Sequence, residues 1–291
     1  MWKTVCFFLC LTAVSTAHAQ IMKEWGWERL DSSTVVCQYE YNRYDPIVDM
    51  QQQETILLEI GNSIAKCYSY DTFEFDSLGS SPSGKKILEE RGADCFRRQA
   101  RASSKEEGLK ILLGLSSRKS DFMIYSHYPE KGKMLVQDAV SDDFYKYMET
   151  LPLQKWSIEE DTMHIIGYPC QKATCKWRGR QYTAWFAPDI PLSYGPYKFG
   201  GLPGLIMKVE DSKQRYLFQI KGIWQEQRGI YLAQPRNGTA YQDGERKELI
   251  ARQAKSKRNM IRALNRDMQR IGNNSRIPSP KDSGVLELDF K

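Results

Sequence analysis

Short strand-like segments joined by short connections run through most of the sequence, and this pattern limits the fold more than any other feature. Between residues 122 and 224, runs rich in β-branched and aromatic residues alternate with connections that contain glycine, proline, aspartate or lysine. Neighbouring strands with short connections pair antiparallel, because a parallel return needs a long crossover. We therefore predict an α+β, mainly β protein: a large curved antiparallel sheet, a half-barrel-like meander, covered on one face by one or two helices.

The earlier part of the chain adds strands to this sheet. Residues 34–41 are rich in β-branched and aromatic side chains, which is typical of a strand. Residues 55–60 and 64–70 have the pattern of two strands joined by a tight turn at Gly61 and Asn62. Residues 105–115 have a helical pattern. The sequence contains no internal repeat and no low-complexity linker, so we predict one domain.

One basic segment near the end of the sequence predicts a C-terminal amphipathic helix over residues 245–271. Residues 243–276 contain 10 basic and 4 acidic residues, a difference equal to the net charge of +6 of the whole chain. A uniformly basic nucleic-acid binder would not concentrate its charge in this way. We predict that the apolar stripe of this helix packs on the core and that its basic face is solvated. The alternative is a membrane-surface module whose basic face contacts anionic lipid headgroups or an acidic partner. The stripe is formed by Ile250, Ala254, Ile261, Leu264, Met268 and Ile271.

The beginning of the sequence has the pattern of a secretory signal peptide. Lys3 precedes an apolar run, and Ala17-His18-Ala19 then fits a cleavage site. We predict that residues 1–19 are removed and that residues 20–291 form the domain, with a tail over residues 272–291. The protein is then exported, to the periplasm or the outer membrane. Beyond residue 20 no apolar run reaches the roughly 18 residues of a membrane span, so we expect no transmembrane helix after signal removal.

The cysteines allow either disulfides or free thiols. Five follow the signal peptide, and an odd number leaves at least one thiol unpaired within the chain. An exported protein reaches a compartment in which disulfides persist. A structural cysteine, or a disulfide from Cys170 to a distant strand such as that of Cys37, is the interpretation that we favour. The disulfide or thiol candidates are Cys37, Cys67, Cys170 and Cys175.

Motifs for catalysis or metal binding are sparse. After the signal peptide the chain has two histidines, His127 and His164, and neither an H-E-x-x-H nor a G-x-S-x-G motif. Residues 79–86 resemble a phosphate-binding loop but lack the serine or threonine that must follow Lys85. We therefore predict no catalytic residue, no metal site and no cofactor. The alternative is a thiol- or metal-dependent enzyme that uses Cys170 and His164.

The glycine- and proline-rich stretch "YGPYKFGGLPGLIMKV" belongs to a loop over residues 188–203. Its prolines stiffen the backbone, and its glycines allow positive φ and close backbone approach. No helix follows whose N-terminus would hold an anion, so the loop is not a phosphate loop. We predict a rigid corner or lid that folds back onto the core. The candidates for ligand or partner binding are Tyr197, Phe199, Gly200, Gly201, Leu202, Pro203 and Gly204.

Two blocks of sequence resemble the GLPGLI family of exported proteins of the Bacteroidota. The central block is "IIGYPCQKATCKWRGRQYTAWFAPDIPLSYGPYKFGGLPGLIMKVED", and the upstream one is "LLEIGNSIAKCYSYDTFEFDS". Cys67 stands where aromatic residues are usual in this family, and Cys175 is an additional cysteine. The resemblance implies an envelope protein of unassigned role. It also implies an association with TonB-dependent outer-membrane transporters, and it transfers no catalytic residue.

From these observations we expect a non-catalytic accessory protein that binds a ligand or partner in the concavity of its sheet. Its partner would be a TonB-dependent transporter or another envelope protein. A small apolar ligand or a peptide would suit an apolar concave wall. Nucleic acid is not expected as a partner.

Overall fold

The computed structural model describes residues 21–45, 50–104, 107–108, 111, 118–235, 238–270 and 286–287. The expected signal peptide lies outside these residues. The helix expected over residues 105–115 also falls mostly outside them. None of the helices among the described residues is both long enough and apolar enough to cross a membrane.

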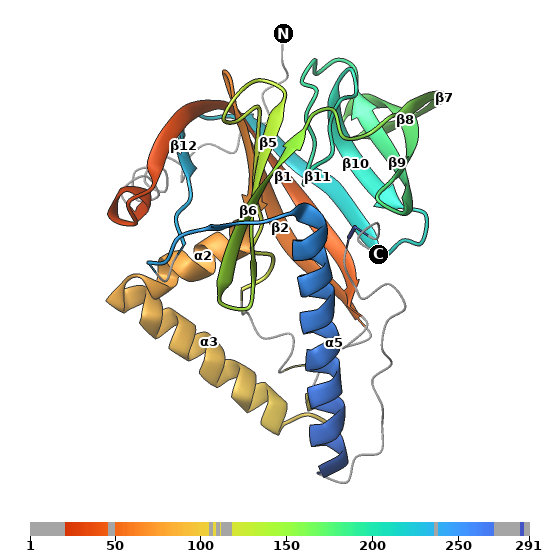
Figure 1. Ribbon diagram of the computed structural model, residues 1–291. Coiled ribbons are helices and arrows are strands. Elements are labelled where there is room, and N and C mark those ends of the chain that lie inside the picture. Colours follow the sequence, from red (N-terminus) through yellow and green to blue (C-terminus); the bar gives the residue numbers. More distant parts are fainter. Residues whose placement is uncertain are drawn as a thin grey trace.

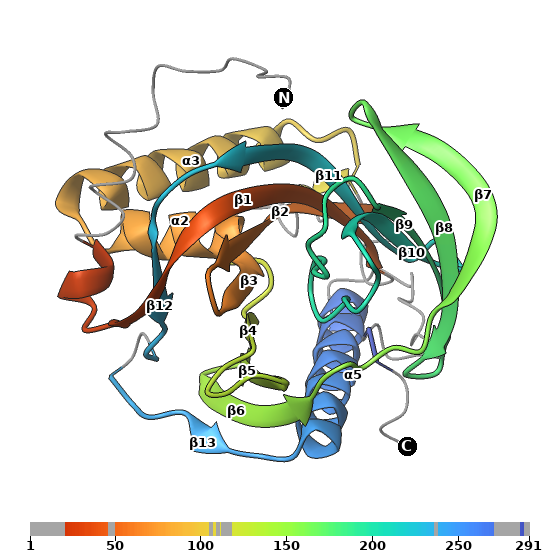
Figure 2. The ribbon, with the colours of Figure 1, turned by 90° about the horizontal axis from the view of Figure 1, so that it is seen from above.

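One large sheet organises the described part of the chain, and it confirms the predicted mainly β fold (Figure 1). It contains 13 strands in the order β13-β6-β5-β4-β3-β2-β1-β11-β10-β9-β8-β7, with β12 paired to β1. Neighbouring strands pair antiparallel, as the short connections require, except for the parallel pair of β13 with β6. The sheet curves through an arc without closing into a barrel (Figure 2).

The strands between residues 123 and 225 lie in the stretch for which the sequence pattern predicts strands. The strands are β1 Glu28–Asp45, β2 Met50–Gly61, β3 Ala65–Ser69, β4 Met123–Ser126, β5 Lys133–Val140, β6 Asp143–Thr150, β7 Ser157–Ile165, β8 Tyr168–Trp177, β9 Arg180–Ala187, β10 Leu205–Asp211, β11 Tyr216–Gln225, β12 Gly229–Leu232 and β13 Gln242–Asp243. The main helices are α2 Tyr70–Gly79, α3 Pro82–Ala100 and α5 Arg246–Arg270.

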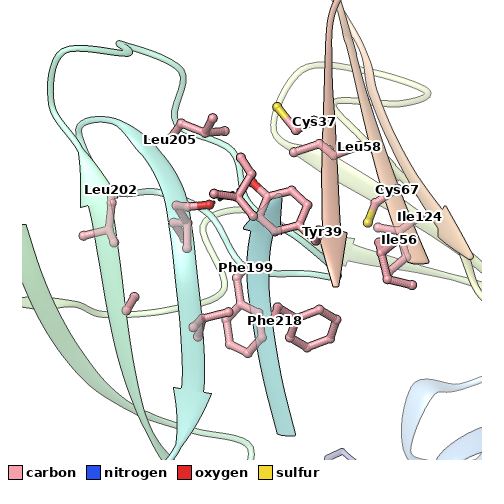
Figure 3. Packing of buried hydrophobic residues seen from close by; sticks show 14 of the residues in the cluster. Cys37, Tyr39, Ile56, Leu58, Cys67, Ile124, Phe199, Leu202, Leu205 and Phe218 are labelled. Atoms are coloured by element: carbon pink, nitrogen blue, oxygen red, sulfur yellow. Dashed lines mark hydrogen bonds between the residues drawn. The ribbon is translucent and has the colours of Figure 1, made fainter. Parts of the chain in front are cut away.

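A row of aligned side chains crosses the concave face of the sheet. Residues directly opposite each other on paired strands point to the same face, so the register defines the row. It runs from β1 to β6 through Cys37, Leu58, Cys67, Ile124, Val136 and Tyr147. All six side chains belong to the main hydrophobic cluster. This row is the wall against which the loop between β9 and β10 packs, and Figure 3 shows part of it.

The neighbouring positions on the same strands face the other side, where α2 and α3 lie. Val36, Leu57 and Tyr68 alternate with the residues of the concave row and pack with Phe73 of α2 in a second cluster. Helix α5 lies instead on the inner side of the arc (Figure 2), and its Leu249 belongs to the main cluster. The sheet is therefore covered on both faces, whereas we predicted helices on one.

The amphipathic pattern of residues 245–271 is confirmed as helix α5. Ile250, Ala254 and Ile261 are buried, as the stripe predicts. Ile271 lies outside the described residues, as do the side chains of Leu264 and Met268. One cation departs from the predicted solvated face, because Arg246 turns inward to a buried carboxylate.

Helix α3 has no counterpart in the sequence prediction, since it buries only Gly84 and Cys95 and so lacks an apolar stripe. The start of this helix accounts for the glycine, serine and proline residues of the stretch 79–86. Ser81 caps the helix by accepting a hydrogen bond from the amide of Gly84, and Pro82 occupies the first turn. The stretch that resembles a phosphate loop is the corner between α2 and α3. Gly84 lies against the backbone of Leu78, where any Cβ would collide.

The two glycines of α3 form a matched pair for testing this corner. Gly84→Ala places a Cβ against the Leu78 carbonyl, and we expect it to lower the free energy of unfolding by about 1–3 kcal/mol. Gly92→Ala meets nothing within 4 Å and should raise the free energy of unfolding by up to about 1 kcal/mol. Urea denaturation measures both. Equal effects of the two substitutions would contradict the close approach at Gly84.

Candidate functional site

The loop between β9 and β10 folds into the concavity of the sheet, as predicted. Phe199 and Leu202 are buried in the main cluster, and the ring of Phe199 lies 6.2 Å from that of Phe218 on β11 (Figure 3). The loop is tied to its own strands, since Leu205 donates to the carbonyl of Ile190 at 3.0 Å. Gly204 leaves no room for a Cβ beside Ala187. The loop is thus a rigid corner whose backbone is fixed.

This corner brings one charged side chain into the core. Lys198 stands between Tyr197 and Phe199 and is 1% exposed. Its ammonium group donates to the Tyr147 hydroxyl at 2.6 Å. It also lies 2.9 Å from a carboxylate oxygen of Glu149 and 2.5 Å from one of Glu287. A buried charge costs several kcal/mol unless it is paired and hydrogen-bonded, and Lys198 has both kinds of partner.

Glu287 is the centre of this arrangement, although it lies far from Lys198 in the sequence. Its side chain is fully buried. One oxygen accepts from Lys198 and, at 2.8 Å, from the Tyr197 hydroxyl. The other oxygen lies 2.7 Å from a guanidinium nitrogen of Arg246 on α5 and 3.6 Å from one of Arg178 in the β8–β9 turn. We call Tyr147, Tyr197, Lys198, Arg178 and Arg246 the carboxylate cradle.

Glu149 on β6 completes the cluster. Its carboxylate lies 2.5 Å from Arg178 and 3.5 Å from Arg246, in addition to its contact with Lys198. The cluster therefore joins β6, the β8–β9 turn, the β9–β10 loop, α5 and the segment at residue 287. No other described part of the molecule brings so many separate elements to one charged point.

Burial and ion pairing oppose each other in setting the pKa values here. Burial alone would lower the pKa of Lys198, but the charge of Glu287, with Tyr147 and Glu149, raises it above its ordinary value. Burial alone would raise the pKa of Glu287, and the charge of and hydrogen bond from Lys198 bring it below its ordinary value. Both side chains are therefore ionised at neutral pH.

A cleft of about 220 Å³ opens beside the cradle. It combines aromatic rings with polar and charged groups, and Leu286 and Glu287 form part of its wall. Asp138 lies in it and accepts a hydrogen bond from Gln253 of α5 at 2.8 Å. The wall of the cleft includes Tyr41, Arg43, Phe122, Asp138, Tyr197, Ile250, Gln253, Lys257, Leu286 and Glu287.

A second, wider hollow of about 560 Å³ lies at the start of the loop. Ile190, Pro191 and Leu192 line it together with Thr34, Val35 and residues 225–227. It lacks a converging group of charges, with Glu226 the one ionisable side chain on its wall. We therefore place the candidate site at the smaller cleft, where the polar contacts converge.

Of the seven loop residues predicted for binding, Tyr197 alone lines the cleft. Phe199, Leu202 and Gly204 are buried in the core, whereas Gly201 and Pro203 are exposed. Gly200 accepts a hydrogen bond from the indole of Trp156 at 2.8 Å. The sequence prediction missed Lys198, whose signal was the single basic residue of a stiff loop rich in glycine, proline and apolar side chains.

The cysteine candidates are all free and buried, so the disulfide that we favoured between Cys170 and a distant strand does not form. Cys37 and Cys67 flank Leu58 in the concave row. Burial raises the pKa of Cys67 to about 12 and that of Cys170 to about 11. Cys175 is likewise raised to about 12 by burial. Such thiols are poor nucleophiles at neutral pH.

The structure does not bring His164 and Cys170 together. Cys170 pairs with Met163 and is buried, whereas His164 pairs with Pro169, points to the opposite face and is exposed. Among the described residues, no three potential metal ligands lie close enough to hold an ion. The other histidine, His127, accepts a hydrogen bond from the amide of Gly132 within the β4–β5 turn.

Removing the charge of Lys198 tests the energetic role of the cluster. Lys198→Met removes the one fully buried cation shared by Glu149 and Glu287, which then keep only Arg178 and Arg246, and we expect the free energy of unfolding to fall by about 3–5 kcal/mol. Lys208→Met is the control, because it breaks a single partly exposed ion pair with Glu210 and should cost less than about 1 kcal/mol. Urea denaturation at pH 7 measures both, and equal losses would contradict a special role for Lys198.

Asp138 predicts a pH dependence of stability. Burial, with the nearby charge of Asp121, raises its pKa to about 7, above the roughly 3.9 of an unfolded chain. The folded state then holds the extra proton between these values, so Asp138 stabilises the fold at low pH and loses this contribution as pH rises through about 7. We expect Asp138→Asn to raise the melting temperature relative to wild type more at pH 8 than at pH 5. Asp189→Asn, at an exposed position, should show no such difference, and an equal shift at both pH values would contradict the raised pKa.

Comparisons with known proteins give a short family match and distant structural similarity. Residues 177–208 match a family model described as a protein of unknown function (Porph_ging). No curated protein matches the sequence. Two solved structures of PNGF-II, in the C2 and P21 space groups, are 12% and 11% identical to this chain, with TM-scores of 0.46 and 0.47. Each covers 77% of this chain, which spans about a third of their length (33% and 34%). The matched family stretch contains the β9–β10 loop and so includes Lys198.

Proposed function

We propose that the chain is a non-catalytic binding protein whose site is the cleft between α5 and the concave face of the sheet. The observation that supports this proposal is the position of the cleft, which opens directly beside a buried group of cations and phenol hydroxyls. Ligand sites commonly combine an apolar wall with a few convergent polar groups. The cleft has this combination, whereas the wider hollow beside Ile190 does not.

We expected a small apolar ligand or a peptide, and the lining of the cleft favours a ligand with both apolar and charged groups over a purely apolar one. Tyr41 and Phe122 supply rings, and Arg43 and Lys257 supply charge at the same opening. A short peptide carries both kinds of group on one backbone. We therefore propose a peptide, free or as part of a partner protein, as the ligand class.

The position of the thiols supports binding over thiol catalysis. A thiolate nucleophile needs a lowered pKa and a base within hydrogen-bond reach, but the pKa of Cys170 is raised by burial and His164 lies on the opposite face. The alternative enzyme based on these two residues therefore has no geometric support.

Export to the periplasm or outer membrane, and association with a TonB-dependent transporter, are part of this proposal. They rest on the signal-peptide pattern of residues 1–19 and on the resemblance to the GLPGLI family. The family match over residues 177–208 falls inside the central block that carries this resemblance. The matched model describes a protein of unknown function and covers only part of that block.

Native mass spectrometry of the full chain, purified from its native source, tests the proposed function. We expect a bound ligand or a co-purifying partner with the wild type. Gln253→Trp fills the cleft from α5 and should abolish this adduct. Gln269→Trp, at an exposed position of the same helix, should retain it. An adduct that survives Gln253→Trp would place the site elsewhere, and a wild type without adduct or partner would contradict the binding function.

A further inference from the structure

The two residues Leu286 and Glu287 are held in the way that a bound peptide is held. They belong to no helix or strand. The carbonyl oxygen of Leu286 accepts from the guanidinium of Arg180 at 2.9 Å and from the hydroxyl of Tyr182 at 3.3 Å. The Leu286 side chain packs on the main cluster, and the Glu287 carboxylate lies in the cradle. Backbone, apolar side chain and acidic side chain are thus each recognised by side chains of the domain.

The contacts to Glu287 are selective for a carboxylate. Each of its two oxygens meets a cation, Lys198 on one side and Arg246 on the other, and the Tyr197 hydroxyl donates to the first oxygen. Charge-assisted hydrogen bonds of this kind are roughly twice as strong as neutral ones. A neutral amide in the same place would lose both ionic contacts. Its NH2 group would also face a donor from which it cannot accept a hydrogen bond.

The cleft is smaller than a typical ligand pocket, and two residues of the chain itself lie in its wall. Its volume of about 220 Å³ lies below the roughly 300 Å³ at which ligand pockets begin. Leu286 and Glu287 form part of its wall, so their departure would join the cleft to the cradle in one larger site. The space for a ligand is therefore partly filled by two residues of the chain itself.

We propose that the cradle and cleft recognise an acidic peptide segment, an apolar residue followed by glutamate, and that Leu286–Glu287 occupies this site as an internal ligand. The inference rests on the proposed binding function and specifies its ligand. A segment of the same chemistry in a partner protein replaces Leu286–Glu287 at the Arg180, Tyr182, Lys198 and Arg246 contacts. An internal ligand competes at an effective concentration on the order of millimolar, so wild-type protein binds such a segment weakly until its own segment is weakened.

The experiment uses a fluorescent synthetic peptide with the sequence of residues 283–291 (SGVLELDFK) and the full-length protein. Glu287→Ala in the protein removes the internal carboxylate and leaves the cradle intact. By fluorescence anisotropy, we expect the variant to bind the peptide at least tenfold more tightly than the wild type does. A peptide with glutamine in place of Glu287 should bind the variant at least tenfold more weakly than the acidic peptide.

Matched variants separate recognition from general effects of charge. Glu248→Ala removes an exposed carboxylate of α5 that pairs with Arg252 and should leave peptide binding at the wild-type level. Adding Arg246→Met to Glu287→Ala should weaken binding of the acidic peptide and leave that of the glutamine peptide unchanged. Circular dichroism verifies folding, and Glu287→Gln replaces Glu287→Ala if the alanine variant does not fold.

Three results would overturn the inference. The first is a folded variant that binds neither peptide, and the second is one that binds both equally. The third is the failure of both Glu287 variants to fold, which would make Leu286–Glu287 a fixed part of the core. A native ligand in the cleft without peptide binding would refute the inference alone, whereas the absence of both would refute the proposed function as well.

Discussion

The ion pairs of one buried lysine determine how the described parts of this protein fit together. Lys198 is placed in the core by a stiff loop, and there it contacts Glu149 of β6 and the distant Glu287. Arg246 of α5 reaches the same two carboxylates. Removing one partner from such a buried group costs several kcal/mol, because the remaining charge stays desolvated. The positions of the loop, α5 and residue 287 are therefore energetically linked.

The sheet supplies the fixed frame for this group. The concave row that begins at Cys37 ends at Tyr147, whose hydroxyl accepts from Lys198. On the other side, Phe199 and Leu202 anchor the loop in the same hydrophobic cluster. Glycines and prolines let the loop turn back tightly enough to place Lys198, next to the anchored Phe199, in the core. The glycines and prolines of this stretch thus serve to position Lys198, and the ionic contacts are made by Lys198 itself.

Much of the fold was predictable from local pattern, whereas the site was not. Apart from the β9–β10 loop, the connections from β4 to β11 are short, so the antiparallel order of these strands follows from the local sequence pattern. Helix α3 was not predicted because it buries only Gly84 and Cys95 and so has no apolar stripe along one face. The other charged residues of the cluster around Lys198 lie at positions 149, 178, 246 and 287, which the curvature of the sheet brings together. No regular spacing in the sequence relates these positions. The sequence instead suggested Cys170 and His164, which the fold places on opposite faces of the sheet.

A double-mutant cycle between Lys198 and Glu287 tests the central ion pair most directly. The free energy of unfolding would be measured for the wild type, Lys198→Met, Glu287→Gln and the double variant at pH 7. Residues in direct contact within one ionic network are coupled by about 0.5–3 kcal/mol. We predict a coupling of at least about 1 kcal/mol, with the double variant less destabilised than the sum of the two single variants. Additivity within about 0.5 kcal/mol would show that the two side chains act independently and would contradict the organisation described above.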